Sequence, residues 1–139
     1  MESRVSEFFD VEIEHLREYI RSLRFIINQS IELITDRIYT RRDLKDMLQD
    51  RIGYMHMELR EIELILRIMH TKVERYKPGD IFLSNFIKSL SDKIHQVHKI
   101  IWSGWDAYLE NPTYGIERYI KALTEAKRII EGIRNEIGI

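Results

Sequence analysis

The stretch "YKPGD", residues 76–80, decides how this sequence folds, because it divides a chain of long helical patterns near its middle. Pro78 and Gly79 interrupt a helix, and the Asp80 side chain can cap the next one. On both sides of this break, apolar residues recur at the intervals of three and four that are typical of amphipathic helices. We therefore predict one long helix that ends here and a second that begins here.

Outward from this break, the same periodicity predicts two more helices. The first runs from Val5 to about Tyr39, or is interrupted near residues 28–30, "NQS". The helix that precedes "YKPGD" then begins at a cap supplied by Thr40 or Asp43.

After the third helix, "ENPTYG" offers Asn111 as a cap, with Pro112 in the first turn of the fourth helix. Four long helices joined by short connections predict an all-α fold, an antiparallel up-down-up-down four-helix bundle. At 139 residues the chain is expected to form a single domain, residues 1–139.

The composition narrows the classes of function. Lys and Arg number 22 against 23 for Asp and Glu, so no basic excess favours non-specific binding to nucleic acid. Cysteine is absent, which removes disulfides and thiolate chemistry. The charged N-terminus and the lack of a long apolar run predict a cytoplasmic protein without a membrane segment. Frequent Ile, Arg and Glu are typical of a thermophile, and we expect an archaeal source.

The stretch "HQVHKIIWSGWDAYLENP", residues 95–112, holds the residues that most resemble a site. On a helical wheel His98 and Trp105 point to the core, whereas His95 and Trp102 lie at its edge. The two histidines therefore do not share a core-facing position, and the alternative is that this i, i+3 pair binds a metal at the helix surface. A di-iron bundle needs two Glu-x-x-His motifs, and only "EIEH", residues 12–15, is present. We predict no metal, no cofactor and no catalytic residue.

Two alternative functions remain. "RIGYMH", residues 51–56, is similar to the Arg-x4-His motif of HEPN-family ribonucleases, which implies a helical enzyme acting on RNA through Arg51 and His56. Ile52 departs from the polar residue common after the arginine, and on one helix Arg51 and His56 would diverge by about 140°. A metal-dependent enzyme acting on RNA belongs to the same alternative. The second is nucleic-acid binding by arginines of the first helix and loop, including Arg17, Arg21 and Arg24.

Several polar residues occupy positions where helical wheels place the core, and we expect them to form a buried polar layer. An antiparallel register pairs Glu12 with Arg134 and sets Arg51 level with Ser30. It also brings Glu58 and His98 to nearly equal heights, with Lys127 within about one turn. We expect the layer to be structural and to fix the helix register; the alternative is a site, since coupled ionisable groups are the raw material of acid-base chemistry. Its members are Glu12, Ser30, Arg51, Glu58, His98, Lys127 and Arg134.

Other large apolar residues fall outside the expected core and widen the apolar faces of the second and third helices. We predict that they form a partner surface, with Trp102 at its edge and Gly104 leaving room for a neighbouring helix. Its residues are Tyr54, Met57, Ile68, Phe82, Ile100, Trp102 and Ile129. The expected function is non-enzymatic binding, as an adaptor, accessory subunit or regulator. The expected partner is another protein or a second copy of the chain, as a homodimer.

Overall fold

The computed structural model describes residues 2–138, and in that range every regular element is a helix, which confirms the all-α prediction. The structure has five helices where four were expected. The first predicted helix is divided at Phe9, and it ends at Thr35 rather than near Tyr39. The helices are α1 (Ser3–Phe8), α2 (Asp10–Thr35), α3 (Arg41–Tyr76), α4 (Ile81–Glu110) and α5 (Pro112–Ile137).

The predicted caps start three of the long helices. Thr40 Oγ1 accepts the Asp43 N–H at 3.1 Å, and Asp80 Oδ1 accepts the Leu83 N–H at 3.0 Å. Asn111 Oδ1 accepts the Tyr114 N–H at 3.4 Å, with Pro112 in the first turn as expected. These side chains satisfy backbone donors that the first turn of a helix leaves free. The alternative break at residues 28–30 is absent, because α2 is continuous there.

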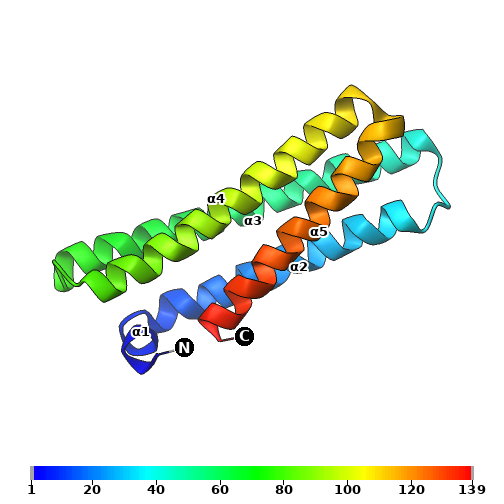
Figure 1. Ribbon diagram of the computed structural model, residues 1–139. Helices are drawn as coiled ribbons and strands as arrows, with labels where there is room; N and C mark the ends of the chain where they lie inside the picture. Colours follow the sequence, from blue (N-terminus) through cyan, green and yellow to red (C-terminus); the bar gives the residue numbers. More distant parts are fainter. Residues whose placement is uncertain (1, 139) are drawn as a thin grey trace.

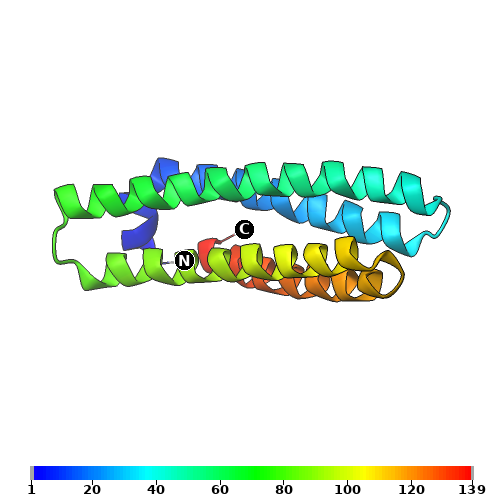
Figure 2. The ribbon, with the colours of Figure 1, turned by 90° about the horizontal axis from the view of Figure 1, so that it is seen from above.

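The four long helices lie in two layers, with α2 and α3 in one and α4 and α5 in the other (Figures 1 and 2). Successive long helices run in opposite directions, and α2 and α4 each pack against both α3 and α5. The turn between α3 and α4 extends beyond the start of α2 and the end of α5 (Figure 1).

Most buried residues of each long helix recur at intervals of three and four, close to the seven-residue pattern of coiled coils, and each helix buries one further residue beside this series, namely Ile26, Ile65, Trp105 and Ile129. Such spacing keeps one narrow stripe of each helix toward its neighbours. Residues that directly flank the stripe then lie along the seams between helices. In α3 the core stripe consists of Leu48, Ile52, Met55, Leu59, Ile62, Leu66, Met69 and Val73.

Helices α4 and α5 approach most closely where glycines replace larger residues. A Cβ added to Gly115 would lie 2.1 Å from the carbonyl oxygen of Ala107. A Cβ added to Gly104 would lie 2.5 Å from the Ala122 Cβ and 3.3 Å from the Tyr119 ring. The space at Gly104 is therefore filled by α5 of the same chain, and the expectation that it admits a partner helix was wrong.

The short helix α1 covers the end of the α3–α4 hairpin (Figure 2). Phe9, fully buried at the bend between α1 and α2, stacks on Phe86 of α4 with ring centroids 6.3 Å apart. Lys72 of α3 donates a hydrogen bond to the Phe8 carbonyl, and the Arg4 guanidinium lies 4.5 Å above the Phe82 ring. The bend at Phe9 thus closes the apolar interior at this end.

The close approach at Gly115 predicts a large effect of a single methyl group. Gly115→Ala should lower the free energy of unfolding by roughly 1–3 kcal/mol, because α4 and α5 must separate to admit it. The matched control is Gly132→Ala, where an added Cβ meets nothing within 4 Å. The control should raise stability by up to about 1 kcal/mol through helix propensity. Urea unfolding measures both, and equal effects of the two changes would contradict the packing described here.

Candidate interaction surface

The seven residues predicted as a partner surface do not lie on one surface. Four are exposed, with accessible fractions between 44 and 61%: Tyr54, Met57, Ile68 and Phe82. The chain itself covers the other three, because Ile100 and Trp102 are half-buried against the core and Ile129 is buried. These three residues lie so close to the core stripes of α4 and α5 that neighbouring helices cover them.

Three of the exposed residues, Tyr54, Met57 and Ile68, belong to one stripe on the outward face of α3. Leu64, which is 46% exposed, completes it. At about 100° per residue, the four side chains fall within an arc of roughly 80°. This arc is approximately opposite the core stripe of the same helix. Tyr54, Met57, Leu64 and Ile68 form a second apolar face of α3, which we call the α3 stripe.

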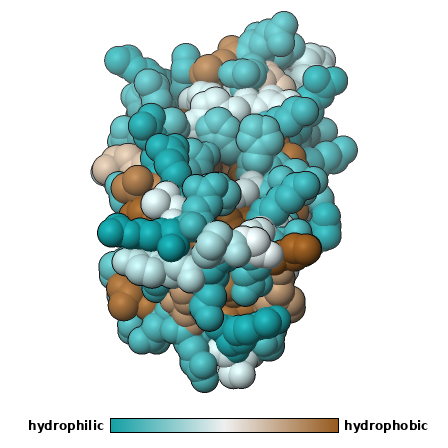
Figure 3. Space-filling view, turned by 90° about the vertical axis from the view of Figure 1, so that its left-hand side faces the viewer, coloured by the Kyte–Doolittle hydropathy of each residue, from teal (hydrophilic) through white to brown (hydrophobic). Residues whose placement is uncertain are grey.

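Phe82 does not belong to the α3 stripe. It lies in the first turn of α4, directly after the turn that joins α3 to α4, and its ring lies beneath the Arg4 guanidinium of α1. Figure 3 shows this end of the molecule, where hydrophobic side chains are separated by hydrophilic ones. Single exposed apolar residues are common on protein surfaces, so Phe82 alone indicates no binding face.

Charged residues adjoin the α3 stripe. Arg60 and Arg67, both exposed, follow its α4 side one heptad apart, and Glu61 lies within it. Within residues 2–138, neither arginine forms an ion pair. The opposite edge carries Arg51, whose guanidinium lies 5.8 Å from the Tyr54 ring. The edges of the stripe therefore carry arginines that form no ion pair within residues 2–138, with the exposed Glu63 between Arg60 and Arg67 on the α4 side.

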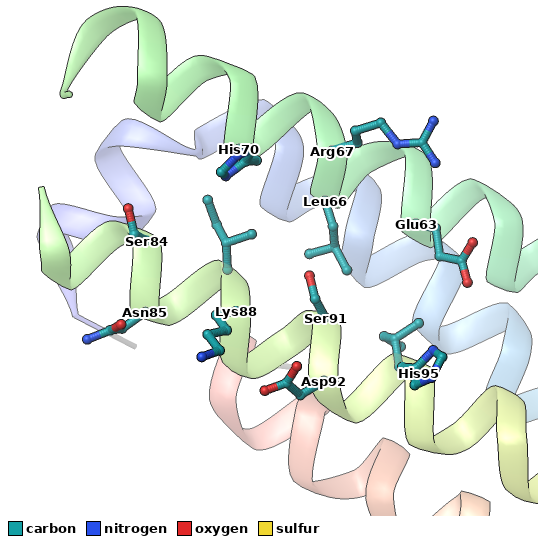
Figure 4. Close-up of a pocket in the computed structure, with 12 residues that line it drawn as sticks. Glu63, Leu66, Arg67, His70, Ser84, Asn85, Lys88, Ser91, Asp92 and His95 are labelled. Atoms are coloured by element: carbon teal, nitrogen blue, oxygen red, sulfur yellow. The ribbon is translucent and has the colours of Figure 1, made fainter. Parts of the chain in front are cut away.

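A groove of about 780 Å³ lies beside this surface, between α3 and α4 (Figure 4). Leu66, Ile87 and Ile94 contribute apolar side chains from the core. The remaining lining is polar and carries both charges: Glu63, Arg67, His70, Ser84, Asn85, Lys88, Ser91, Asp92 and His95. Short serine side chains of α4 face α3 here, which leaves the groove open (Figure 4). Arg67 belongs both to this lining and to the edge of the α3 stripe.

His56 of α3 and His98 of α4 form an aromatic cluster with Trp102 on the same seam. His98 stacks on Trp102 with ring centroids 4.6 Å apart, and His56 lies 5.6 Å from Trp102. His56 and His98 are 6.3 Å apart, and the buried Nδ1 of His56 has no hydrogen-bond partner in the described structure. His95 instead lines the groove. The two histidines of residues 95–98 thus have different surroundings, but His98 is half-buried and stacks on Trp102, which the wheel had placed at the edge with His95.

The predicted polar layer lies along the helix seams. Of its seven members only Ser30 is fully buried, and its hydroxyl donates to the Ile26 carbonyl at 3.0 Å. The other six are half-buried: Glu12, Arg51, Glu58, His98, Lys127 and Arg134. They flank the core stripes, and four of them, Glu12, Arg51, Glu58 and Arg134, each have a buried side-chain nitrogen or oxygen without a hydrogen-bond partner in the described structure.

The pairing proposed for Glu12 and Arg134 was wrong. Glu12 accepts a hydrogen bond from Lys72 Nζ at 2.8 Å, and Arg134 instead binds Glu131 at 2.9 Å. Glu131 also binds Arg24 of α2, so one carboxylate joins α2 to α5. The partners could not be chosen from axial heights alone, because height does not tell which seam a side chain enters.

Glu58 lies in the seam between α2 and α3. Burial raises the pKa of its carboxyl, while the Ser22 hydroxyl acts in the opposite direction and the charge of Glu61 raises it further. One carboxyl oxygen of Glu58 is buried without a hydrogen-bond partner in the described structure. Its environment therefore disfavours the charged form, as expected for a carboxylate beside a core.

The residues expected to act in the ribonuclease and nucleic-acid-binding alternatives do not come together as a site. Arg51 lies on the α2 side of α3, whereas His56 faces His98 of α4, so the two do not converge within the chain. Arg17 donates to the Ile137 carbonyl at 2.9 and 3.1 Å, and Arg24 binds Glu131. Two of the three arginines in the stripe of the first long helix thus fasten α5 to α2.

Comparisons with protein-family models, curated proteins and solved structures find no match for the chain. Among residues 2–138, no three His, Cys, Asp or Glu side chains are grouped so that they could hold a metal ion. No helix in the same range combines the length and apolarity needed to cross a bilayer.

Sequence reasoning missed Leu64, the basic edge of the stripe, and two ion-pair partners, Lys72 and Glu131. Leu64 continues the three-and-four spacing of Met57 and Ile68, so a search for a second periodic stripe on α3 would have found it. Arg51, Glu58, Ile65 and Lys72 follow one another at intervals of seven, so Lys72 enters the same seam. That repeat was also readable in the sequence.

The observed pairing predicts coupling between specific residues. In a double-mutant cycle of urea unfolding, Glu12→Ala and Lys72→Ala should be non-additive by roughly 0.5–1 kcal/mol, since their charged groups are in contact. The matched cycle, Glu12→Ala with Arg134→Ala, should be additive within about 0.5 kcal/mol. Coupling in the second cycle without coupling in the first would show that the seams are assigned incorrectly.

Proposed function

We propose that the protein acts by binding another protein through the α3 stripe, without catalysis of its own. The observation that carries this proposal is the second apolar face of α3. Its four large residues are each about half exposed, and they follow helical spacing opposite the core. From Tyr54 to Ile68 the stripe extends about 21 Å along the helix. The four residues form two apolar pairs, Tyr54 with Met57 and Leu64 with Ile68, on either side of Glu61, and exposed apolar side chains gathered on one face mark interaction sites more often than scattered ones do.

The setting of α3 supports this function. In our proposal α2–α5 form an antiparallel up-down-up-down four-helix bundle, to which α1 is added. Helix α3 is the longest of them, and it is held by α2 on one side and α4 on the other. A rigid helix face loses little conformational freedom when a partner binds, which favours affinity.

The composition supports the rest of this proposal. A nearly neutral chain without cysteine fits a cytoplasmic adaptor, accessory subunit or regulator, and the abundance of Ile, Arg and Glu fits a thermophilic archaeon. A homodimer, in which a second copy occupies the stripe, is the other form of the same function.

Copurification with stripe variants tests the proposal. Leu64→Glu and Ile68→Glu place charges in the stripe and should abolish recovery of a partner that the wild-type protein retains. The matched control is Phe25→Glu, a residue 62% exposed on α2 and outside the stripe, which should retain that partner. Circular dichroism and urea unfolding confirm that each variant is folded.

If folded Leu64→Glu and Ile68→Glu variants retain every partner, the α3 stripe is not the binding surface. Sedimentation velocity of the same proteins distinguishes the homodimer. Self-association of the wild type that is lost in both stripe variants but kept in Phe25→Glu would identify a second copy as the partner.

A further inference from the structure

The occupant of the α3 stripe can be specified further, on the basis of the proposed function, from a glycine and the charges beside it. Gly53 lies in the interior of α3, exposed, one residue before Tyr54 and one turn before Met57. Glycine is the least favourable helix residue after proline. A Cβ at Gly53 would meet nothing within 4 Å, whereas Gly104 and Gly115 are required by helix packing. Packing within the chain therefore gives no reason for Gly53.

Close approach of an outside backbone would give such a reason. Without a side chain at residue 53, a helix laid along the stripe can come nearer to α3 beside Tyr54 and Met57. Small residues at a contact shorten the distance between two packed helices. Gly132 of α5 has the same open surroundings, so the glycine alone does not identify the occupant; the helical spacing of the stripe favours a helix, and Gly53 leaves room for that helix to come close.

The charges argue against a second copy in that position. An antiparallel copy in the register that sets Met57 against Ile68 would place Arg60 within two residues, about 3 Å of axial rise, of Arg67 of the copy. A parallel copy would place Glu61 against Glu61 in the middle of the apolar contact. Both arrangements bring like charges together, which disfavours association.

We infer that the α3 stripe receives an amphipathic helix of a different protein, with carboxylates along the edge that meets Arg60 and Arg67. Such a helix covers Tyr54, Met57, Leu64 and Ile68 with its apolar side and passes close to α3 at Gly53. Arg60 and Arg67 are exposed and unpaired within residues 2–138, so an acidic edge would complement them without displacing a pair of the chain. Arg67 also lines the α3–α4 groove, into which side chains of the bound helix can extend.

Two synthetic peptides of about 21 residues, six helical turns, serve as probes. They share one leucine stripe and differ only in their flanking residues, which are Glu in the first and Lys in the second. Calorimetric titration of the full chain at low salt should give a Kd roughly ten-fold lower for the acidic peptide. In the variant with Arg60→Glu and Arg67→Glu this preference should reverse.

Glycine variants test the close approach. Gly53→Ala should raise the Kd of the acidic peptide several-fold, because the added methyl group obstructs the contact. The same change should make the free protein more stable, because alanine favours the helix. Gly132→Ala, the matched control on α5, should raise stability in the same way without changing the Kd. A Kd unchanged by Gly53→Ala overturns the close approach, and equal affinity for the two peptides overturns the acidic partner.

The outcomes separate this inference from the proposed function. If both peptides bind with equal affinity and Leu64→Glu abolishes the binding of both, the α3 stripe remains the binding surface and the acidic helix is wrong. If neither peptide binds, or if Leu64→Glu changes nothing, the inference fails together with the α3 stripe as a helix-binding face. A wild-type dimer that Leu64→Glu dissociates would show that a second copy occupies the stripe, which also overturns the inference.

Discussion

Burial at alternating intervals of three and four is the constraint on which the rest of this structure depends. Each long helix buries one narrow stripe of side chains. The position of any other residue around the helix, measured from that stripe, decides whether it lies in a seam or faces outward. Residues directly beside it enter the seams, where Glu12 meets Lys72 and Lys93 meets Glu136. Residues opposite it face outward. Because the core uses so little of α3, a second apolar stripe on that helix is left uncovered.

The ends and seams of the molecule follow from the same constraint. A regular seven-residue pattern brings α4 and α5 together only if small residues stand where their backbones come closest, at Gly104 and Gly115. At the other end, α3 and α4 continue past α2 and α5. The interior is covered there by Val5 of α1 and by Phe9 at the bend between α1 and α2. Polar groups that cannot leave the seams, such as Glu58, are held in less favourable surroundings than water.

More of the fold than of the binding surface could be predicted from the sequence. Caps at Thr40, Asp80 and Asn111 act within one turn, so local sequence was sufficient to place the starts of three helices. The bend at Phe9 was missed because it depends on stacking with Phe86, a contact between residues far apart in the chain. Similarly, Gly104 showed that a helix approaches but not whether that helix belongs to the same chain. Ile129 and Trp102 were assigned to a surface because wheels give directions but not the width of the neighbours that cover them.

Methionine oxidation measures directly which side of α3 is exposed. It therefore tests the claim that this helix has one buried and one exposed apolar stripe. Met57 is 61% exposed, whereas Met55 and Met69 on the same helix are fully buried. During brief treatment of the folded protein with hydrogen peroxide, followed by mass spectrometry, Met57 should be converted to the sulfoxide well before Met55 or Met69. Protection of Met57 equal to that of Met55, or oxidation of Met55 as fast as Met57, would contradict the account.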